Sequence, residues 1–225
     1  MREILLIGGG GHCRSCIDVL EATGEFRIVG VVQPTKQRGE TVLGYPVKGG
    51  DEDLPLLLRE TPRALVTVGQ IRSAATRKRL LGLLEEYRAD LPVVLSPFAW
   101  VSPRASLSRG TIVMHSAIVN TGAEIGANGI LNSRALVEHD ARIGDHCHIA
   151  TGAIVNGDCI VEEESFIGSG AVLREGVTVG ARSVIGAGCV ITRDISPGSL
   201  IRPSRERNRG GEFPHRGDPQ EETIQ

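Results

Sequence analysis

The sequence predicts a chain of two architectures: an α/β N-terminal domain with a small Rossmann-like parallel sheet (residues 1–95) and an all-β parallel β-helix of hexapeptide repeats (residues 96–200). Two observations predict this division. A strand pattern, a run of glycines and a helix pattern open the chain, and from Val101 to Ile191 every sixth residue is aliphatic. Residues 201–225 are rich in Arg, Glu, Gly and Pro without periodicity, which predicts a flexible tail.

The α/β domain is predicted from alternating strand and helix patterns. Strands are expected at Glu3–Ile7, Ile28–Val32, Ala64–Val68 and Leu91–Leu95, and helices between the glycine run and Gly24, at Leu54–Arg59 and at Ala74–Tyr87. Such alternation gives a parallel sheet with helices on its faces, and these sheets bind ligands at the carboxyl ends of their strands. The glycine run follows the first strand directly and is therefore a candidate binding site.

The glycine run, with the histidine that follows it, is Gly8, Gly9, Gly10, Gly11 and His12. Glycines let the backbone approach a phosphate, and the following helix offers free N–H groups and a favourable dipole. The dinucleotide fingerprint is incomplete, because Cys13 stands where its third glycine belongs and Gln33 where an acidic ribose ligand is expected. We therefore expect a phosphate-bearing ligand other than NAD, with a ligand-free tight turn as the alternative.

The β-helix is predicted from sixteen consecutive register positions, all occupied by Ile, Leu or Val. They are Val101, Leu107, Val113, Val119, Ile125, Leu131, Val137, Ile143, Ile149, Val155, Val161, Ile167, Leu173, Val179, Ile185 and Ile191. The fourth residue after each register position is nearly always small. A period of six fits neither an α-helix nor an alternating strand, whereas large and small residues in this order fill the narrow interior of a β-helix.

Three hexads make one coil, so residues 18 apart stack at about 4.8 Å. The outward residues that precede the register positions then form three columns. The first is Ile112, Ile130, His148, Phe166 and Val184; the second is Ile118, Leu136, Ile154, Val172 and Val190; the third is Ser106, Glu124, Arg142, Ile160, Thr178 and Ser196. Two columns are apolar, and we expect both to pack against sister subunits of a homotrimer. His148 interrupts one of them, so it is expected beside the subunit cleft as a structural histidine or a ligand contact.

His139 is a candidate general base on an outward turn. It is followed by Asp140, and a carboxylate beside a histidine orients the ring and makes it more basic. Gly157 stands 18 residues later in the same column, where it would leave room and a bare N–H that could stabilise an oxyanion. A solvent-exposed histidine on a turn is the alternative.

Composition excludes several classes of protein. The net charge of −2 and the aromatic content of 3% do not suit a nucleic-acid-binding protein, which needs positive charge for phosphates or aromatic side chains for bases. The chain opens without a signal-peptide pattern and contains no apolar stretch of about 20 residues, so no membrane insertion is expected and a cytoplasmic location is.

The cysteines and the remaining histidines suggest packing rather than metal chemistry. Three cysteines, Cys147, Cys159 and Cys189, fall on the small interior phase, and Cys13 and Cys16 form a C-x-x-C that is either a redox pair or part of a helix core. His115 and His146 also face outward, but their spacing to the other histidines does not suit a shared site. No metal is therefore expected.

The chain resembles the nucleotide-sugar acetyltransferases of the left-handed β-helix class, which include bacillosamine and perosamine N-acetyltransferases and sialic-acid-locus O-acetyltransferases. The resemblance covers roughly residues 3–200. It is carried by the glycine run through His12, the Gly44–Val47 segment, the hexad register, and the run from Asn132 to Asp145 with Gly157. Gly69, and Arg77 in the following helix, also match.

The resemblance implies a role in glycan biosynthesis and a homotrimer that transfers an acetyl group from acetyl-CoA to the amino group of a nucleotide-linked sugar. The family's catalytic histidine and its carboxylate map to His139 and Asp140. The residues that contact the acetyl group or CoA map to His148 and Gly157, and CoA would lie between adjacent β-helices. The nucleotide sugar would occupy Gly8, Gly9, Gly10, Gly11 and His12, with Gln33, Gly69 and Arg77.

Direct transfer in a ternary complex is the expected mechanism. His139 would take a proton from the attacking amine, Asp140 would stabilise the imidazolium, and the Gly157 N–H would bind the oxyanion. Three alternatives stay open at this point: O-acetylation of a sugar, a metal-dependent hydratase of the trimeric β-helix kind, and a non-catalytic β-helical assembly module.

Overall fold

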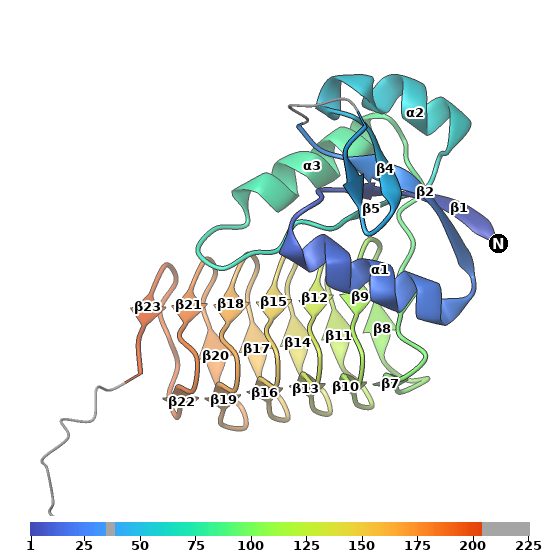
Figure 1. Cartoon of the computed structure of the whole chain (residues 1–225). Helices are drawn as coiled ribbons and strands as arrows, with labels where there is room; N and C mark the ends of the chain where they lie inside the picture. Colours follow the sequence, from blue (N-terminus) through green and yellow to red (C-terminus); the bar gives the residue numbers. More distant parts are fainter. Residues whose placement is uncertain (35–38, 204–225) are drawn as a thin grey trace, which may run out of the picture.

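A computed structural model describes residues 1–34 and 39–203 of the chain (Figure 1). The N-terminal part holds a five-stranded sheet in the order β3-β4-β2-β1-β5. Its strands are β1 (Arg2–Ile7), β2 (Phe26–Val32), β3 (Thr41–Val42), β4 (Tyr45–Gly49) and β5 (Ala64–Val66). All neighbours are parallel except β3 and β4, which pair antiparallel as a hairpin that the sequence patterns did not predict.

Three α-helices cover this sheet: α1 (Gly11–Thr23), α2 (Leu54–Glu60) and α3 (Ala75–Glu86). A 3-10 helix, η1 (Asp51–Asp53), leads into α2. Helix α1 ends at Gly24, whose left-handed backbone lets its N–H donate to Glu21 O. The expected helices are therefore present, and none of the helices among the described residues is long and apolar enough to cross a bilayer.

The second part is a triangular coil of two-residue parallel strands, which we describe as three faces. The first face consists of β6 (Val94–Leu95), β9 (Ile112–Val113), β12 (Ile130–Leu131), β15 (His148–Ile149), β18 (Phe166–Ile167), β21 (Val184–Ile185) and β23 (Leu200–Ile201). The second face consists of β7 (Trp100–Val101), β10 (Ile118–Val119), β13 (Leu136–Val137), β16 (Ile154–Val155), β19 (Val172–Leu173) and β22 (Val190–Ile191). The third face consists of β8 (Ser106–Leu107), β11 (Glu124–Ile125), β14 (Arg142–Ile143), β17 (Ile160–Val161) and β20 (Thr178–Val179).

This coil is the predicted left-handed hexapeptide β-helix. Register partners are 18 residues apart, as in Val119 opposite Val137, and the aliphatic register residues fill the core together with small residues such as Ala135 and Ala153. The third residue after a register position takes a positive φ at corner after corner, for example Asp140 at 59°. The corners therefore have one backbone shape, which turns the residue before the positive-φ position outward.

The expectation that both apolar columns pack against sister subunits is wrong for Ile112 and Ile130 of the first column, while Phe166 and Val184 of the same column are only half-buried within the chain. Ile112 and Ile130 are fully buried within the chain, in one core cluster with Cys13, Ile17 and Leu20 of α1. Helix α1 lies beside the β9 and β12 end of the first face in Figure 1, and its apolar residues pack against that end. On the second face, Trp100, Ile118 and Val190 stay exposed.

Two other expectations are refined by the structure. The strand expected over Leu91–Leu95 begins at Val94 and pairs with β9, so it starts the first face of the β-helix rather than ending the N-terminal sheet. All five cysteines are buried and free, and burial raises the pKa of both Cys13 and Cys16, which favours the packing interpretation of the C-x-x-C. Most of the predicted tail, residues 204–225, lies outside the described residues.

Candidate active site

His139 lies on the corner that joins β13 to β14, between the second and third faces. Its Nδ1–H donates to Asp140 Oδ2 at 3.0 Å, and half of its side chain (49%) is exposed. Glu138 reinforces the corner, because its Oε2 accepts hydrogen bonds from Asn120 Nδ2 at 2.8 Å and from the His139 backbone N–H at 3.3 Å. The ring is thus oriented by Asp140, with Nε2 left for a substrate.

The surroundings of His139 make it a stronger base. The hydrogen bond to Asp140 raises the pKa of His139 above its ordinary value, and the carboxylates of Asp140, Asp158 and Glu138 act in the same direction. A histidine with a raised pKa holds a transferred proton more firmly. This corner can therefore accept a proton from an attacking group near neutral pH.

Two glycines on neighbouring coils leave space for the His139–Asp140 pair. A Cβ atom at Gly157 would lie 2.5 Å from His139 Cε1 and 2.6 Å from its Nε2, and a Cβ at Gly122 would overlap the Asp140 carboxylate. Asp158 donates its N–H to His139 O, but the Gly157 N–H donates no hydrogen bond among the described residues. An unused N–H next to the imidazole is what an oxyanion donor requires.

The glycine loop lies at the carboxyl ends of β1, β2 and β5, as predicted. Gln33 lies against Gly9, since a Cβ at Gly9 would come within 2.7 Å of Gln33 Cδ. Gly69 packs against His12 in the same way, since a Cβ at Gly69 would lie 3.3 Å from His12 Cβ. Helix α1 begins behind Gly10 without a side-chain cap, so its first N–H groups are free for an anion.

Sequence reasoning missed Thr67, which belongs to this loop region. Its hydroxyl donates to Gly8 O at 2.6 Å, and its side chain is buried. It follows β5 in an otherwise apolar stretch, so no motif distinguished it from a core residue.

His148 lies in β15 on the first face, next to His12 of α1 and the loop after β5, and its place beside a subunit cleft stays a prediction. Its Nδ1–H donates to Gln70 O at 2.8 Å, and Asn132 Nδ2 donates to its Nε2 at 3.1 Å. The His12 ring is 6.1 Å away between centroids. Burial lowers the pKa of His148 to about 4 and that of His12 to about 3, and the positive charge of Arg77 acts in the same direction on both rings. Both rings are therefore neutral near pH 7.

Arg77 was expected to contact substrate, but it is only 1% exposed. Its Nη1 donates to Val68 O at 2.6 Å, and its Nη2 donates to Asn128 Oδ1 at 2.6 Å and also to Asn128 O. Both terminal nitrogens are thus engaged by protein oxygens at the junction between α3 and the β-helix. A direct contact of these nitrogens with substrate does not fit this geometry.

The structure does not bring the two groups of predicted residues together within one chain. His148 belongs to the first face, and the glycine loop belongs to the N-terminal part, which packs against that face in Figure 1. His139 lies on the corner opposite that face, because it joins the other two faces of the triangle. The cross-section of the β-helix therefore separates the two groups within one chain.

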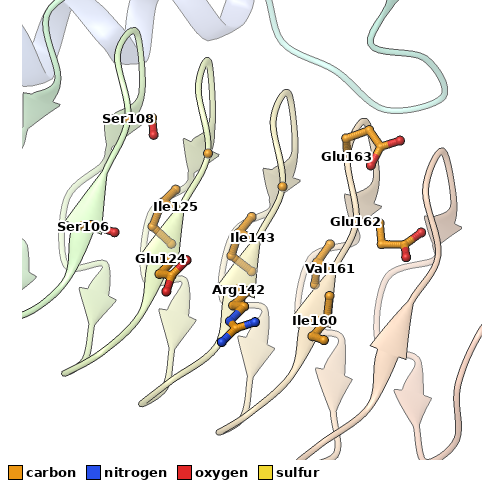
Figure 2. Close-up of a pocket in the computed structure, with 12 residues that line it drawn as sticks. Ser106, Ser108, Glu124, Ile125, Arg142, Ile143, Ile160, Val161, Glu162 and Glu163 are labelled. Carbon is orange, nitrogen blue, oxygen red and sulfur yellow. The ribbon is translucent and has the colours of Figure 1, made fainter.

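A hollow on the third face contains none of the predicted catalytic residues. Figure 2 shows it along β8, β11, β14 and β17, with Glu124, Arg142 and Ile160 on the strands and Glu163 on a corner; its volume is about 330 Å³. Elsewhere His115 Nδ1 bonds Ser96 Oγ at 2.6 Å, and His146 Nδ1 accepts from Asn128 at 3.0 Å. Over residues 1–34 and 39–203, no three His, Cys, Asp or Glu side chains group as metal ligands.

Comparison with known families identifies both parts of the chain. Residues 3–82 match the PglD N-terminal domain, and residues 158–193 match the bacterial transferase hexapeptide of six repeats. A comparison with curated proteins found no match.

Solved structures align with almost the whole chain. The acetyltransferase domain of PglB from Neisseria gonorrhoeae is 33% identical, with 89% of this chain and 96% of that chain covered and a TM-score of 0.79; the same domain is also known in complex with acetyl coenzyme A. PerB from Caulobacter crescentus, in complex with CoA and GDP-perosamine, is 35% identical, with 89% and 93% covered and a TM-score of 0.81. Variants of that perosamine N-acetyltransferase with one histidine changed to Asn or Ala were solved with the same two molecules.

Proposed function

The chain belongs to the family of hexapeptide-repeat acetyltransferases that contains PerB and the PglB acetyltransferase domain, and we propose that it transfers acetyl from acetyl-CoA to the amino group of a nucleotide-linked sugar. The observation that carries the proposal is the His139–Asp140 pair above an unused Gly157 N–H, in a chain that also has a free helix N-terminus behind a glycine loop. The first group suits acyl transfer, and the second suits a diphosphate.

The proposed chemistry is a direct displacement. The sugar nitrogen attacks the thioester carbonyl, His139 Nε2 takes a proton from that nitrogen, and the Gly157 N–H stabilises the oxyanion of the tetrahedral intermediate. Collapse of the intermediate breaks the C–S bond, and the CoA thiolate leaves and takes up a proton. Asp140 holds the ring through Nδ1 and stabilises the imidazolium while it carries the proton.

The carboxylates around His139 favour an amine as the acceptor. Glu138, Asp140 and Asp158 all add negative potential at the ring. A sugar amine arrives as a cation, which this potential attracts, whereas a hydroxyl group gains nothing from it. The cationic amine loses one proton to solvent before it attacks, and His139 is the group placed to accept the second proton, from the nitrogen of the adduct.

We further propose that the working unit is a homotrimer whose active sites lie between subunits. Support comes from the second face, where Trp100, Ile118 and Val190 form an apolar surface that the chain itself leaves exposed. A neighbour packed there would bring its glycine loop and His148 toward His139 across the interface, with CoA between the β-helices. We also propose a cytoplasmic location, because all five cysteines are free and the reducing cytoplasm keeps thiols free.

Thiol release tests the function. The protein is incubated with acetyl-CoA and GDP-perosamine, with UDP-linked 4-amino sugars, and with the corresponding 4-hydroxy sugars, and free CoA is followed with a thiol reagent. We expect turnover with an amino sugar, none with its hydroxy counterpart, and loss of turnover in His139→Ala by a factor of about 10² to 10⁴. Equal turnover with the hydroxy sugar, or full activity of His139→Ala, would contradict the proposal.

A further inference from the structure

We infer that Arg77 is a positioning residue that fixes the nucleotide-sugar site against the β-helix instead of binding substrate; this inference rests on the function proposed above. The guanidinium joins the two parts of the chain directly. Nη1 donates to Val68 O, in the loop after β5, and Nη2 donates to the side chain and backbone of Asn128, on the corner between the third and first faces.

The charge of Arg77 is held by carbonyl oxygens alone. No carboxylate forms an ion pair with it within the described part of the chain, and burial lowers its pKa to about 10, which leaves it protonated at neutral pH. Burying an unpaired charge is costly, and an apolar side chain would pack more cheaply. An apolar residue, however, could not hydrogen-bond to carbonyl groups from two parts of the chain and so hold them at a fixed distance.

The loop that Arg77 holds is the loop that supports the ligand site. A Cβ at Gly8 would lie 3.2 Å from Val68 N, and Gly69 packs against the His12 side chain. The Gln70 carbonyl accepts a hydrogen bond from His148 Nδ1–H, and the Gln70 side chain donates from Nε2 to Glu164 O at 3.1 Å. A shift of Val68 would therefore displace the glycine loop and His12, while the His139 corner would stay unchanged.

Substitution on both sides of the contact tests this role. Arg77→Lys keeps the positive charge but loses the two terminal guanidinium nitrogens that bind Val68 and Asn128 together. Asn128→Gly removes Oδ1, and glycine tolerates the positive φ of 54° at this position. We expect Arg77→Lys to raise the KM for the nucleotide sugar by about tenfold, the equivalent of one lost hydrogen bond to a charged group, with a smaller change in the KM for acetyl-CoA. Asn128→Gly should act in the same direction, and the double variant should be less than additive.

The control is Arg79→Lys, on the same helix, where the exposed side chain pairs with Asp51 and should tolerate the change. Binding of GDP and UDP to each variant by calorimetry gives a readout that does not need turnover. An unchanged nucleotide affinity in folded Arg77→Lys, or an equal loss for acetyl-CoA, overturns the inference; if Arg77→Lys fails to fold, Asn128→Gly decides by the same criteria. A wild-type protein that binds nucleotide but transfers no acetyl group would instead refute the proposed function.

Discussion

The ring of His139 rests directly on the backbone of Gly157, so closely that a Cβ atom at Gly157 would lie 2.5 Å from His139 Cε1. The two residues are 18 positions apart and therefore one coil apart, as the pairing of β13 with β16 requires. The absence of a side chain at Gly157 lets the imidazole come close to the neighbouring coil while its Nδ1 is bonded to Asp140. The small residue is thus part of how the base is oriented.

Gly157→Ala should lower kcat by about 10², because the added methyl group displaces His139 and screens the N–H expected to bind the oxyanion. The melting temperature should change little, since the methyl group points to the surface side of the coil. Glu175→Ala, one coil further in the same column and exposed, is the matched control. Steady-state kinetics with both substrates saturating would measure the effect, and a kcat within twofold of wild type would count against this arrangement.

Asp140→Asn should shift the acidic limb of the kcat/KM profile to lower pH. The hydrogen bond to Asp140 raises the pKa of His139, and the base must be deprotonated to act, so wild-type activity rises as the pH increases through that raised pKa. Removing the carboxylate lowers the pKa and also the maximum rate. A profile measured with a saturating second substrate checks the direction, and a limb that stays in place would mean that another group titrates.

Stacking explains why this pair could be predicted from sequence while other parts of the site could not. In a coil with a strict period, the neighbour of His139 is found by counting, and the outward turn phase follows from the register. The burial of Ile130 depends instead on how α1 packs on the first face, which the six-residue period does not determine. The partners of Arg77 could not be predicted for the same reason, because its contacts with Val68 O and Asn128 Oδ1 form only when the two parts of the chain pack together.

The buried histidines should make the protein less stable in acid. Burial lowers the pKa of His148 from 6.5 to about 4 and that of His12 from 6.5 to about 3. Below pH 6.5 these two histidines therefore bind protons in the unfolded chain but stay neutral in the folded chain until the pH reaches the lowered pKa. The contribution of these histidines to the free energy of unfolding is fully present above pH 6.5. It falls as the pH drops from 6.5 toward the lowered pKa values, by at most about 1.4 kcal/mol per pH unit for each histidine. Thermal unfolding from pH 7.5 to 4.5 should show a shallower decline in His148→Gln than in wild type; parallel curves would contradict the assignment.

Active sites shared between subunits predict complementation. His139→Ala removes the base, and Gly10→Asp places a negative charge at the free N-terminus of α1, so each variant alone should be inactive. After unfolding and refolding together, mixed trimers would contain some interfaces with an intact His139 from one chain and an intact glycine loop from another. Activity should then reappear, whereas mixing without subunit exchange should give none. Failure to recover activity in proven mixed trimers would place the whole site within one chain.

The second face can be tested as the subunit interface with two isoleucines of nearly equal exposure. Ile118 on the second face is 39% exposed and Ile160 on the third face is 38% exposed, so a change to Glu costs each a similar amount within the chain. Ile118→Glu would place a charge in the proposed interface and should yield monomers by light scattering, with loss of activity because the site needs a neighbour. Ile160→Glu should remain a trimer with wild-type kcat. If both variants form trimers equally well, the second face is not the subunit interface. A site shared between subunits would then have to form through a different surface.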